Sequence, residues 1–202
     1  MDSFVIVIGR QYGSGGRSLG KKLAEKLGVQ YYDKELLSET ADSLGFSKEL
    51  FMKADERKPS FFRSFVSFNY GSPSAAFSSY VLSDDNLYRA QSHVIKAIAE
   101  KGPCIIVGRT ADYVLRDHPG LISVFVHAPI EHRAKTIISR GEAETEEKAM
   151  EKARKLDRSR ESYYNFFTNR NWGHADNYHL TFDSSVVSID EIADLIASRL
   201  HK

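Results

Sequence analysis

A glycine-rich stretch at residues 9–18 constrains this chain more than any other feature of its sequence. It directly follows an apolar run at residues 4–8 and precedes a pattern in which leucines recur every four residues. A buried strand, a glycine loop and a helix in this order can cradle phosphate. Glycines let backbone N–H groups approach an oxyanion, and the helix N-terminus adds positive dipole. The sequence therefore predicts an anion-binding loop after the first strand.

The loop departs from the P-loop signature, which ends in glycine, lysine and a hydroxyl residue. In one register Arg17 takes the lysine's place, but the leading glycine of the signature then falls at Gln11. In a second register, of the form G-x-G-K-G-T, Gly16 takes the lysine's place. Both registers place the hydroxyl of Ser18 on Mg²⁺. They leave open whether Arg17 or Arg10 supplies the missing positive charge.

Length and charge narrow the classes of protein to which the chain can belong. Its 202 residues fit one domain with room for an inserted subdomain. A net charge of +1 gives no reason to expect nucleic acid or a membrane surface as partner, so a small molecule is expected. The single cysteine, Cys104, lies in an apolar run and fits a reducing compartment. With no signal peptide or membrane span recognised, we expect a cytoplasmic protein, and the sequence indicates no oligomeric state.

Periodicity and turn residues predict alternating strands and helices. Strands are expected at residues 4–8, 29–32, 104–107, 121–126 and 178–182. Helices are expected at residues 17–27, 34–44, 83–102, 129–140, 142–170 and 188–200. Residues 47–80 break this alternation with prolines, serines and many aromatic side chains, and are interpreted as a helical insertion. The alternation is typical of a three-layer α/β fold with a parallel sheet of about five strands.

Charged residues follow two of these strands, at the sheet edge where open α/β folds bind ligands. Asp33 ends the second strand and can cap the next helix, contact a ligand, or do both. Arg109 follows the third strand, where an arginine favours an anionic ligand. Near the C-terminus the helical stretch at 142–170 carries arginines with few acids beyond residue 154. A guanidinium cluster of this kind suits phosphoryl transfer, although an exposed basic helix is the alternative.

Taken together, these motifs resemble those of the nucleoside monophosphate kinases, and most closely the cytidylate kinase-like branch. The resemblance is carried by residues 8–17, 31–35, 108–109, 157–160 and 182–185. It implies a single P-loop kinase domain that transfers phosphate from ATP to CMP or dCMP with Mg²⁺. Its core would be residues 1–46, 81–140 and 173–202, with an acceptor-binding insertion at 47–80 and a helical lid at 141–172.

The resemblance also implies roles for individual residues. The ATP phosphates would be bound by Gly9, Gly13, Ser14, Gly15, Gly16, Arg17 and Ser18, with Ser18 also on the metal. The acceptor would be contacted by Asp33, Arg109, Asp157 and Arg160. The catalytic residues would be Arg17, Arg154, Arg158 and Arg160.

The sequence departs from the cytidylate kinase pattern at Val107 and Thr110, which each stand where that pattern has an acid. Two rival interpretations follow from these departures and from the missing lysine. One is a P-loop kinase of another small metabolite, and the other is a nucleotide-binding regulator without kinase turnover.

Overall fold

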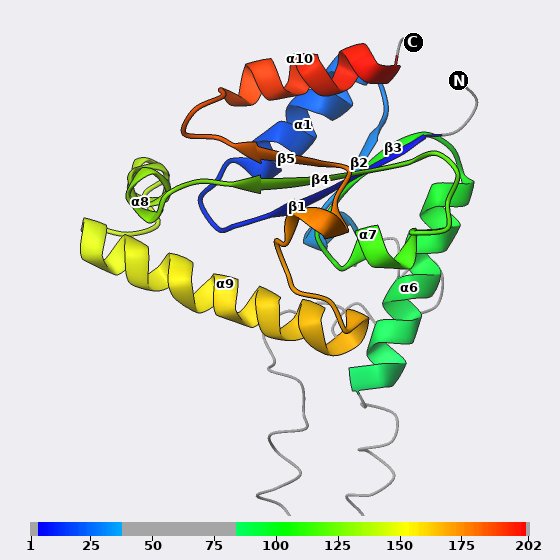
Figure 1. Ribbon diagram of the computed structural model, residues 1–202, viewed down its shortest axis with the longest axis horizontal. Coiled ribbons are helices and arrows are strands. Elements are labelled where there is room, and N and C mark those ends of the chain that lie inside the picture. Colours follow the sequence, from blue (N-terminus) through cyan, green and yellow to red (C-terminus); the bar gives the residue numbers. More distant parts are fainter. Residues whose placement is uncertain (1–3, 38–83, 201–202) are drawn as a thin grey trace, which may run out of the picture.

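The computed structural model describes residues 4–37 and 84–200, which form a parallel sheet between helical layers (Figure 1). The five strands lie in the order β2-β3-β1-β4-β5, and every neighbouring pair is parallel. Their bounds are β1 Val5–Arg10, β2 Gln30–Tyr32, β3 Cys104–Val107, β4 Leu121–His127 and β5 Leu180–Asp183. Because all strands run the same way and β1 is central, the loop after β1 lies at the middle of the carboxyl edge.

Helices cover both faces of this sheet. Their bounds are α1 Gly16–Leu27, α6 Asp84–Glu100, α7 Ala111–Val114, α8 Ile130–Ser139, α9 Glu146–Thr168 and α10 Ile189–Leu200, with a 3-10 turn, η2, at Ala175–Asn177. Helices α1 and α10 pack on one face, and α6 and α7 pack on the other. The three-layer α/β architecture with five parallel strands is thus confirmed.

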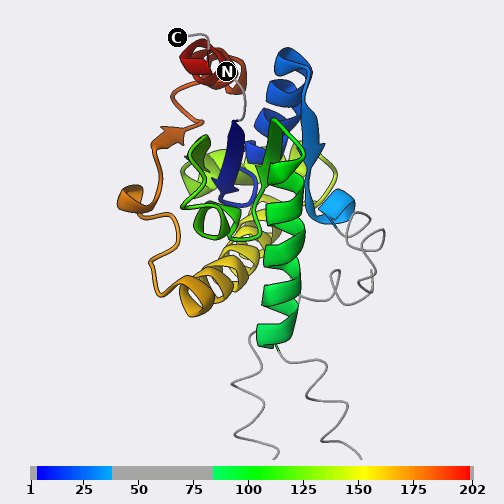
Figure 2. The same cartoon turned by 90° about the vertical axis from the view of Figure 1, so that its right-hand side faces the viewer.

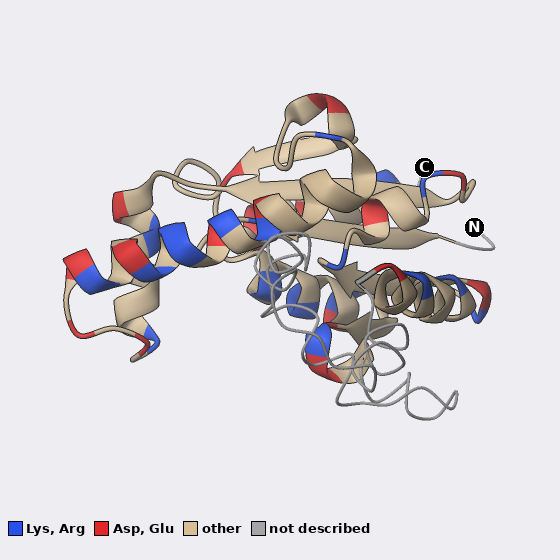
Figure 3. Cartoon of the chain, turned by 90° about the horizontal axis from the view of Figure 1, so that it is seen from below, with Lys and Arg blue, Asp and Glu red and all other residues tan. Residues whose placement is uncertain are grey.

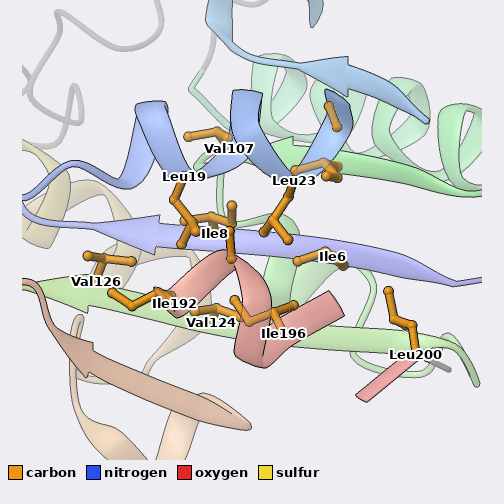
Figure 4. Packing of buried hydrophobic residues seen from close by; sticks show 13 residues of the cluster. Ile6, Ile8, Leu19, Leu23, Val107, Val124, Val126, Ile192, Ile196 and Leu200 are labelled. Carbon is orange, nitrogen blue, oxygen red and sulfur yellow. The ribbon is translucent and has the colours of Figure 1, made fainter. Parts of the chain in front are cut away.

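The central strand explains why the core divides in two. All apolar side chains of β1 are buried, as expected for a parallel strand covered on both faces. Because side chains alternate along a strand, Val5 and Val7 pack toward α6 and α7, whereas Ile6 and Ile8 pack toward α1 and α10. Figure 4 shows the second cluster, in which Leu19 and other α1 and α10 side chains meet the sheet.

Helix α9 is a single helix of 23 residues that lies outside the two layers. Its N-terminal half packs on α8 through the buried alanines Ala134, Ala149 and Ala153, whose small side chains let the helices approach closely. Its C-terminal half reaches α6 (Figures 1 and 2). There the rings of Tyr88 and Phe167 stack with their centroids 4.3 Å apart. The helix therefore runs from α8 to α6 (Figure 1), and it lies in the segment predicted to be a lid.

Most predicted elements agree with the structure to within a few residues. Gly28 caps α1 with a φ of 65°, and Ser188 and Glu191 form the expected capping box before α10. Cys104 is buried in β3, and burial raises the pKa of its thiol to about 12. The helix predicted at 34–44 is described only to residue 37, and the insertion at 47–80 lies outside the described residues. Helix α7 was not predicted.

Within the described ranges, every helix is too short or too polar to cross a lipid bilayer.

Candidate functional site

The loop between β1 and α1 is fixed in place by the end of β4. The backbone N–H of Gln11 donates to the carbonyl of Val126 at 3.0 Å. The Ser14 hydroxyl lies 2.9 Å from the carbonyl oxygens of both Gln11 and Val126. Ser14 is buried, its hydroxyl is engaged and its backbone N–H lies 3.4 Å from the carbonyl of Gln11, so its predicted phosphate contact stays a prediction.

Gly15 leaves the N-terminus of α1 open. It lies at the N-cap with a φ of 87°, a left-handed conformation that glycine adopts without strain, and no side chain caps the helix. The first hydrogen bond of the helix is donated by Leu19 N to Gly15 O at 2.9 Å. The N–H groups of residues 16–18 come before it and have no acceptor within the helix. Those groups and the helix dipole suit the phosphates of ATP. Ser18, predicted to bind Mg²⁺, lies in this first turn.

Gly9 has a packing role that the sequence did not indicate. It belongs to β1, and a Cβ on it would approach Phe125 Cδ2 to 2.8 Å and Tyr178 Cε1 to 3.1 Å. Glycine at this position therefore lets two aromatic rings pack against the strand below the loop. Its predicted contact with phosphate stays a prediction.

Arg17 points its guanidinium at the end of β2. Its Nη2 lies 2.8 Å from Asp33 Oδ2 and 3.2 Å from Glu35 Oε2, and its Nε also donates to Asp33. Asp33 in turn accepts from the backbone N–H of Glu35 and Leu36, so it caps the helix that begins at Lys34. Burial acts to raise the pKa of Asp33, but its hydrogen bonds outweigh burial and hold that pKa below its usual value.

Asp157 joins α9 to the loop. Its Oδ1 accepts from the backbone N–H of Tyr12 at 2.7 Å, and its Oδ2 accepts from Arg133 Nη1 at 2.6 Å. Arg133 also donates to the carbonyls of Ala128 and Tyr12 and is almost fully buried. These contacts favour a positioning role for Asp157, and its predicted contact with the acceptor stays a prediction.

Two adjoining cavities open at the carboxyl edge. The first, which we call the loop cavity, is lined by the glycine loop with Arg17, Asp33 and Glu35. The second, the strand-end cavity, lies between the end of β3 and α9, and its lining includes Arg109, Asp112, Tyr163, Tyr164, Trp172 and Tyr178. Three cationic side chains line both cavities: Arg10, Lys34 and Arg160. The arrangement provides two neighbouring places for anionic ligands with positive charge at their common boundary.

Arg109 enters the strand-end cavity from an unusual backbone. Gly108, Arg109 and Thr110 have φ values of 83°, 63° and 52°, three left-handed residues in succession. A branched residue such as Thr110 rarely adopts this conformation, and such strain occurs most often at functional sites. Arg109 is only 9% exposed, so the turn places a guanidinium in a largely buried wall of the cavity. The predicted contact of Arg109 with an anion stays a prediction.

Asp112 is the acidic residue among the described residues that line the strand-end cavity, and it is buried. The hydroxyl of Tyr164 donates to its Oδ2 at 2.8 Å, and Tyr178 lies close to the same pair. Burial raises the pKa of Asp112 to about 6, against the lowering effects of the Tyr164 hydrogen bond and of Arg170. The cavity therefore contains a carboxyl group whose protonation changes near neutral pH.

Replacing Asp112 with asparagine is expected to stabilise the protein at neutral pH. The unfolded carboxyl ionises near pH 4 but the folded one near pH 6, so wild-type stability falls as pH rises through this window. Asparagine does not titrate and still accepts from Tyr164. The difference in free energy of unfolding between variant and wild type should therefore shift by about 3 kcal/mol in favour of the variant from pH 3.5 to pH 7.5. Urea denaturation of variant and wild type at both pH values measures this gain, and the exposed Asp117→Asn is the control. If Asp112→Asn differed from wild type by the same amount at both pH values, the raised pKa of Asp112 would be contradicted.

The arginines of α9 fall into two groups. Charged residues of both signs lie along this helix (Figure 3). Arg160 lines both cavities, donates to the carbonyl of Arg10 at 3.2 Å and lies over the ring of Tyr12. Arg154 and Arg158 are exposed and belong to the lining of neither cavity. The structure thus brings Arg160 to the site, and the catalytic roles of Arg154 and Arg158 stay predictions.

Three residues of the site were not assigned to it from sequence: Lys34 and Tyr178, which line a cavity, and Arg133, which holds the loop. The sequence predicts Lys34 as the start of a helix and as part of the motif at residues 31–35, Tyr178 as the start of a strand and Arg133 as part of a helix. For Lys34 a signal existed, because it directly follows a strand at the edge where ligands bind. Arg133 and Tyr178 reach the site through packing between distant segments, for which the local pattern gives no signal.

Comparisons with known proteins place this geometry in context. Over 99% of both chains, the structure is similar to an uncharacterised protein from Eubacterium ventriosum, with a TM-score of 0.73 and 27% identity. It is also similar to a shikimate kinase from Bacteroides thetaiotaomicron, with a TM-score of 0.55 and 13% identity over 98% of this chain and 99% of that one. A shikimate kinase from Acinetobacter baumannii in complex with shikimate gives a TM-score of 0.50 and 15% identity, over 98% of this chain and 92% of the other. No curated protein matches by sequence.

The two shikimate kinases have 13% and 15% sequence identity to this chain, so their similarity shows a common fold and nothing about substrate. The family model for the cytidylate kinase-like family matches residues 5–186, which is most of the chain and includes the loop, both cavities and α9. This match supports a kinase that transfers phosphate to a small metabolite, without singling out CMP. The chain belongs to the cytidylate kinase-like family.

Proposed function

We propose that this protein transfers the γ-phosphoryl group of ATP to a nucleoside monophosphate, with CMP or dCMP as the first candidates. The observation that carries the proposal is the pair of adjoining cavities with Arg10, Lys34 and Arg160 at their boundary. Transfer between two phosphorylated ligands requires two anion sites in contact, with positive charge where the phosphoryl group passes. CMP and dCMP come first because the family takes its name from cytidylate kinases.

In this proposal the loop cavity binds ATP. The loop around Gly13 and Gly15 and the open N-terminus of α1 would hold the phosphates through backbone N–H groups. Mg²⁺, with Ser18 as its predicted protein ligand, would neutralise charge on the phosphate oxygens. Asp157 and Arg133 contribute indirectly, because they hold the Tyr12 backbone and therefore the shape of the loop.

The strand-end cavity would bind the acceptor. Arg109 from its buried wall and Arg160 from α9 both line this cavity and would contact the acceptor phosphate. The aromatic side chains of Tyr163, Trp172 and Tyr178 offer apolar surface for a base or sugar. Since a phosphate oxygen is already anionic, the protein mainly has to align the ligands, exclude water and neutralise charge. Asp33 stays a predicted acceptor contact, and its bond to Arg17 places it at the loop cavity.

One observation favours a second candidate, a kinase whose acceptor is a hydroxyl group. A hydroxyl must lose a proton during transfer, and a carboxyl with a pKa of about 6 inside the acceptor cavity, as at Asp112, suits a general base. The two candidates differ in pH dependence. With a hydroxyl acceptor, kcat should fall as pH drops below about 6 and Asp112 becomes protonated. With a phosphate acceptor, Asp112 has no proton to accept.

The test is ADP release from ATP and Mg²⁺ with CMP, dCMP, UMP, AMP and GMP supplied one at a time, beside a reaction without acceptor. We expect release well above the control with CMP or dCMP. Shikimate, the ligand of one protein of this fold, serves as a hydroxyl-bearing probe for the second candidate. Absence of release with every nucleoside monophosphate would contradict the proposed function.

A further inference from the structure

The side chain of Arg10 occupies the space that a side chain at position 16 would need. A Cβ built on Gly16 would lie 2.5 Å from Arg10 Cβ and 2.9 Å from Arg10 Cγ, both closer than real carbon atoms approach. The next contact, with Ile8 Cγ2 at 3.5 Å, is an ordinary one. Arg10 alone therefore prevents a larger residue at the first position of α1.

The guanidinium of the same residue lies against the end of β3. A Cβ on Gly108 would approach Arg10 Nη1 to 1.9 Å and Cζ to 3.0 Å. Arg10 thus runs from the last position of β1 across two glycines, Gly16 and Gly108, to the boundary of the loop and strand-end cavities. The Cβ and Cγ of Arg10 explain why position 16 is glycine, whereas at position 108 the left-handed φ of 83° by itself favours glycine.

The first residue of α1 helps to distinguish the two registers in which the loop can be aligned with a P-loop. Gly15 is the left-handed N-cap and α1 begins at Gly16, which supports the register that puts Gly16 in the lysine's place. In that register Arg17 is one position too late. Its guanidinium is also held by Asp33 and Glu35 at the end of β2.

We propose that Arg10 supplies the phosphate-contacting cation that a P-loop lysine provides elsewhere, entering from β1 instead of α1. The inference rests on the proposed function, because it assumes that the loop cavity binds ATP phosphates. A guanidinium is a planar fork that can contact two phosphate oxygens, whereas a lysine acts as a point charge. Because Arg10 lines both cavities, its guanidinium can contact the γ-phosphate of ATP at the boundary where that phosphate would meet the acceptor. Arg17 then acts as a positioning residue through its pair with Asp33.

Calorimetric titration with MgATP and with adenosine tests this role without requiring turnover. Arg10→Gln should weaken MgATP binding by about tenfold to a hundredfold, the effect of losing hydrogen bonds to a charged group, and leave adenosine binding unchanged. Lys21→Gln, an exposed change on α1 outside both cavities, is the matched control and should bind both ligands as wild type does.

A double variant that moves the cation from position 10 to position 16 distinguishes the effect of the positive charge from a structural effect of the Arg10 side chain. Arg10→Gly removes the Cβ that blocks position 16, and adding Gly16→Lys returns a cation to the first residue of the helix. The double variant should recover most of the MgATP affinity that Arg10→Gly loses.

Undiminished MgATP affinity in Arg10→Gln would overturn the inference and leave the proposed function standing. An equal loss of adenosine affinity, or no recovery in the double variant, would show a merely structural role and also overturn it. Failure of the wild-type protein to bind MgATP would overturn the proposed function, and the inference with it.

Discussion

Replacing Asp157 with asparagine is expected to lower the free energy of unfolding by about 3–5 kcal/mol, the usual cost of removing one partner of a buried ion pair. The change leaves the guanidinium of Arg133, 8% exposed, without the carboxylate that lies 2.6 Å away. It also weakens the hydrogen bond that holds the Tyr12 backbone. Guanidinium chloride denaturation of the variant and wild type measures the loss.

Two further variants make this prediction specific. Asp117→Asn removes a carboxylate that is 87% exposed and 3.7 Å from Arg116, so the free energy of unfolding should change by less than about 0.5 kcal/mol. Arg133→Met combined with Asp157→Asn should cost less than the sum of the two single changes, because no charge is left buried alone. If Asp157→Asn were as mild as Asp117→Asn, the pair would not be what holds α9 to the loop.

Replacing Arg160 with glutamine is expected to reduce turnover roughly 100-fold to 1000-fold, the range for removing a group that stabilises developing charge. Arg160 lines both cavities and is held in place by the Arg10 carbonyl and the Tyr12 ring. Its side chain is 26% exposed and its ion pair with Asp157 is long, at 3.8 Å, so losing that pair should cost little stability. The measurement is kcat with ATP and the best acceptor, beside thermal denaturation.

Lys155→Gln provides the control for Arg160 on the same helix. Lys155 is exposed and lines neither cavity, so this variant should turn over as wild type does. A fall in kcat for Lys155→Gln as large as that for Arg160→Gln would point to the general charge of α9 rather than to a placed guanidinium.

The sequence predicted the fold because the signals that determine it are local. The apolar run of β1, the glycine loop and the α1 periodicity are contiguous, and the caps at Gly28 and Ser188 involve residues within a few positions of one another. Helix α7 was missed because it follows Arg109 and Thr110 in left-handed conformations, which local propensity does not favour for these residues.

The site was harder to predict because its contacts join distant segments. Asp157 and the Tyr12 backbone are 145 residues apart, and no sequence pattern links them. The register of the loop stayed open in the sequence for the same reason. That the Cβ and Cγ of Arg10 fill the space at Gly16 depends on how the strand packs against the helix, which residue spacing does not show. The position of Arg109 at the edge of the sheet, in contrast, follows from the single strand that precedes it.

The central claim is that ATP and a nucleoside monophosphate exchange a phosphoryl group across the boundary of the two cavities. The most direct test supplies ATP labelled on its γ-phosphorus together with CMP and Mg²⁺, and separates the products by chromatography. The account predicts that the label appears in CDP, at a rate that rises with CMP concentration and saturates. Label that remains in ATP or passes only to inorganic phosphate, with CMP and with every other nucleoside monophosphate, would contradict it.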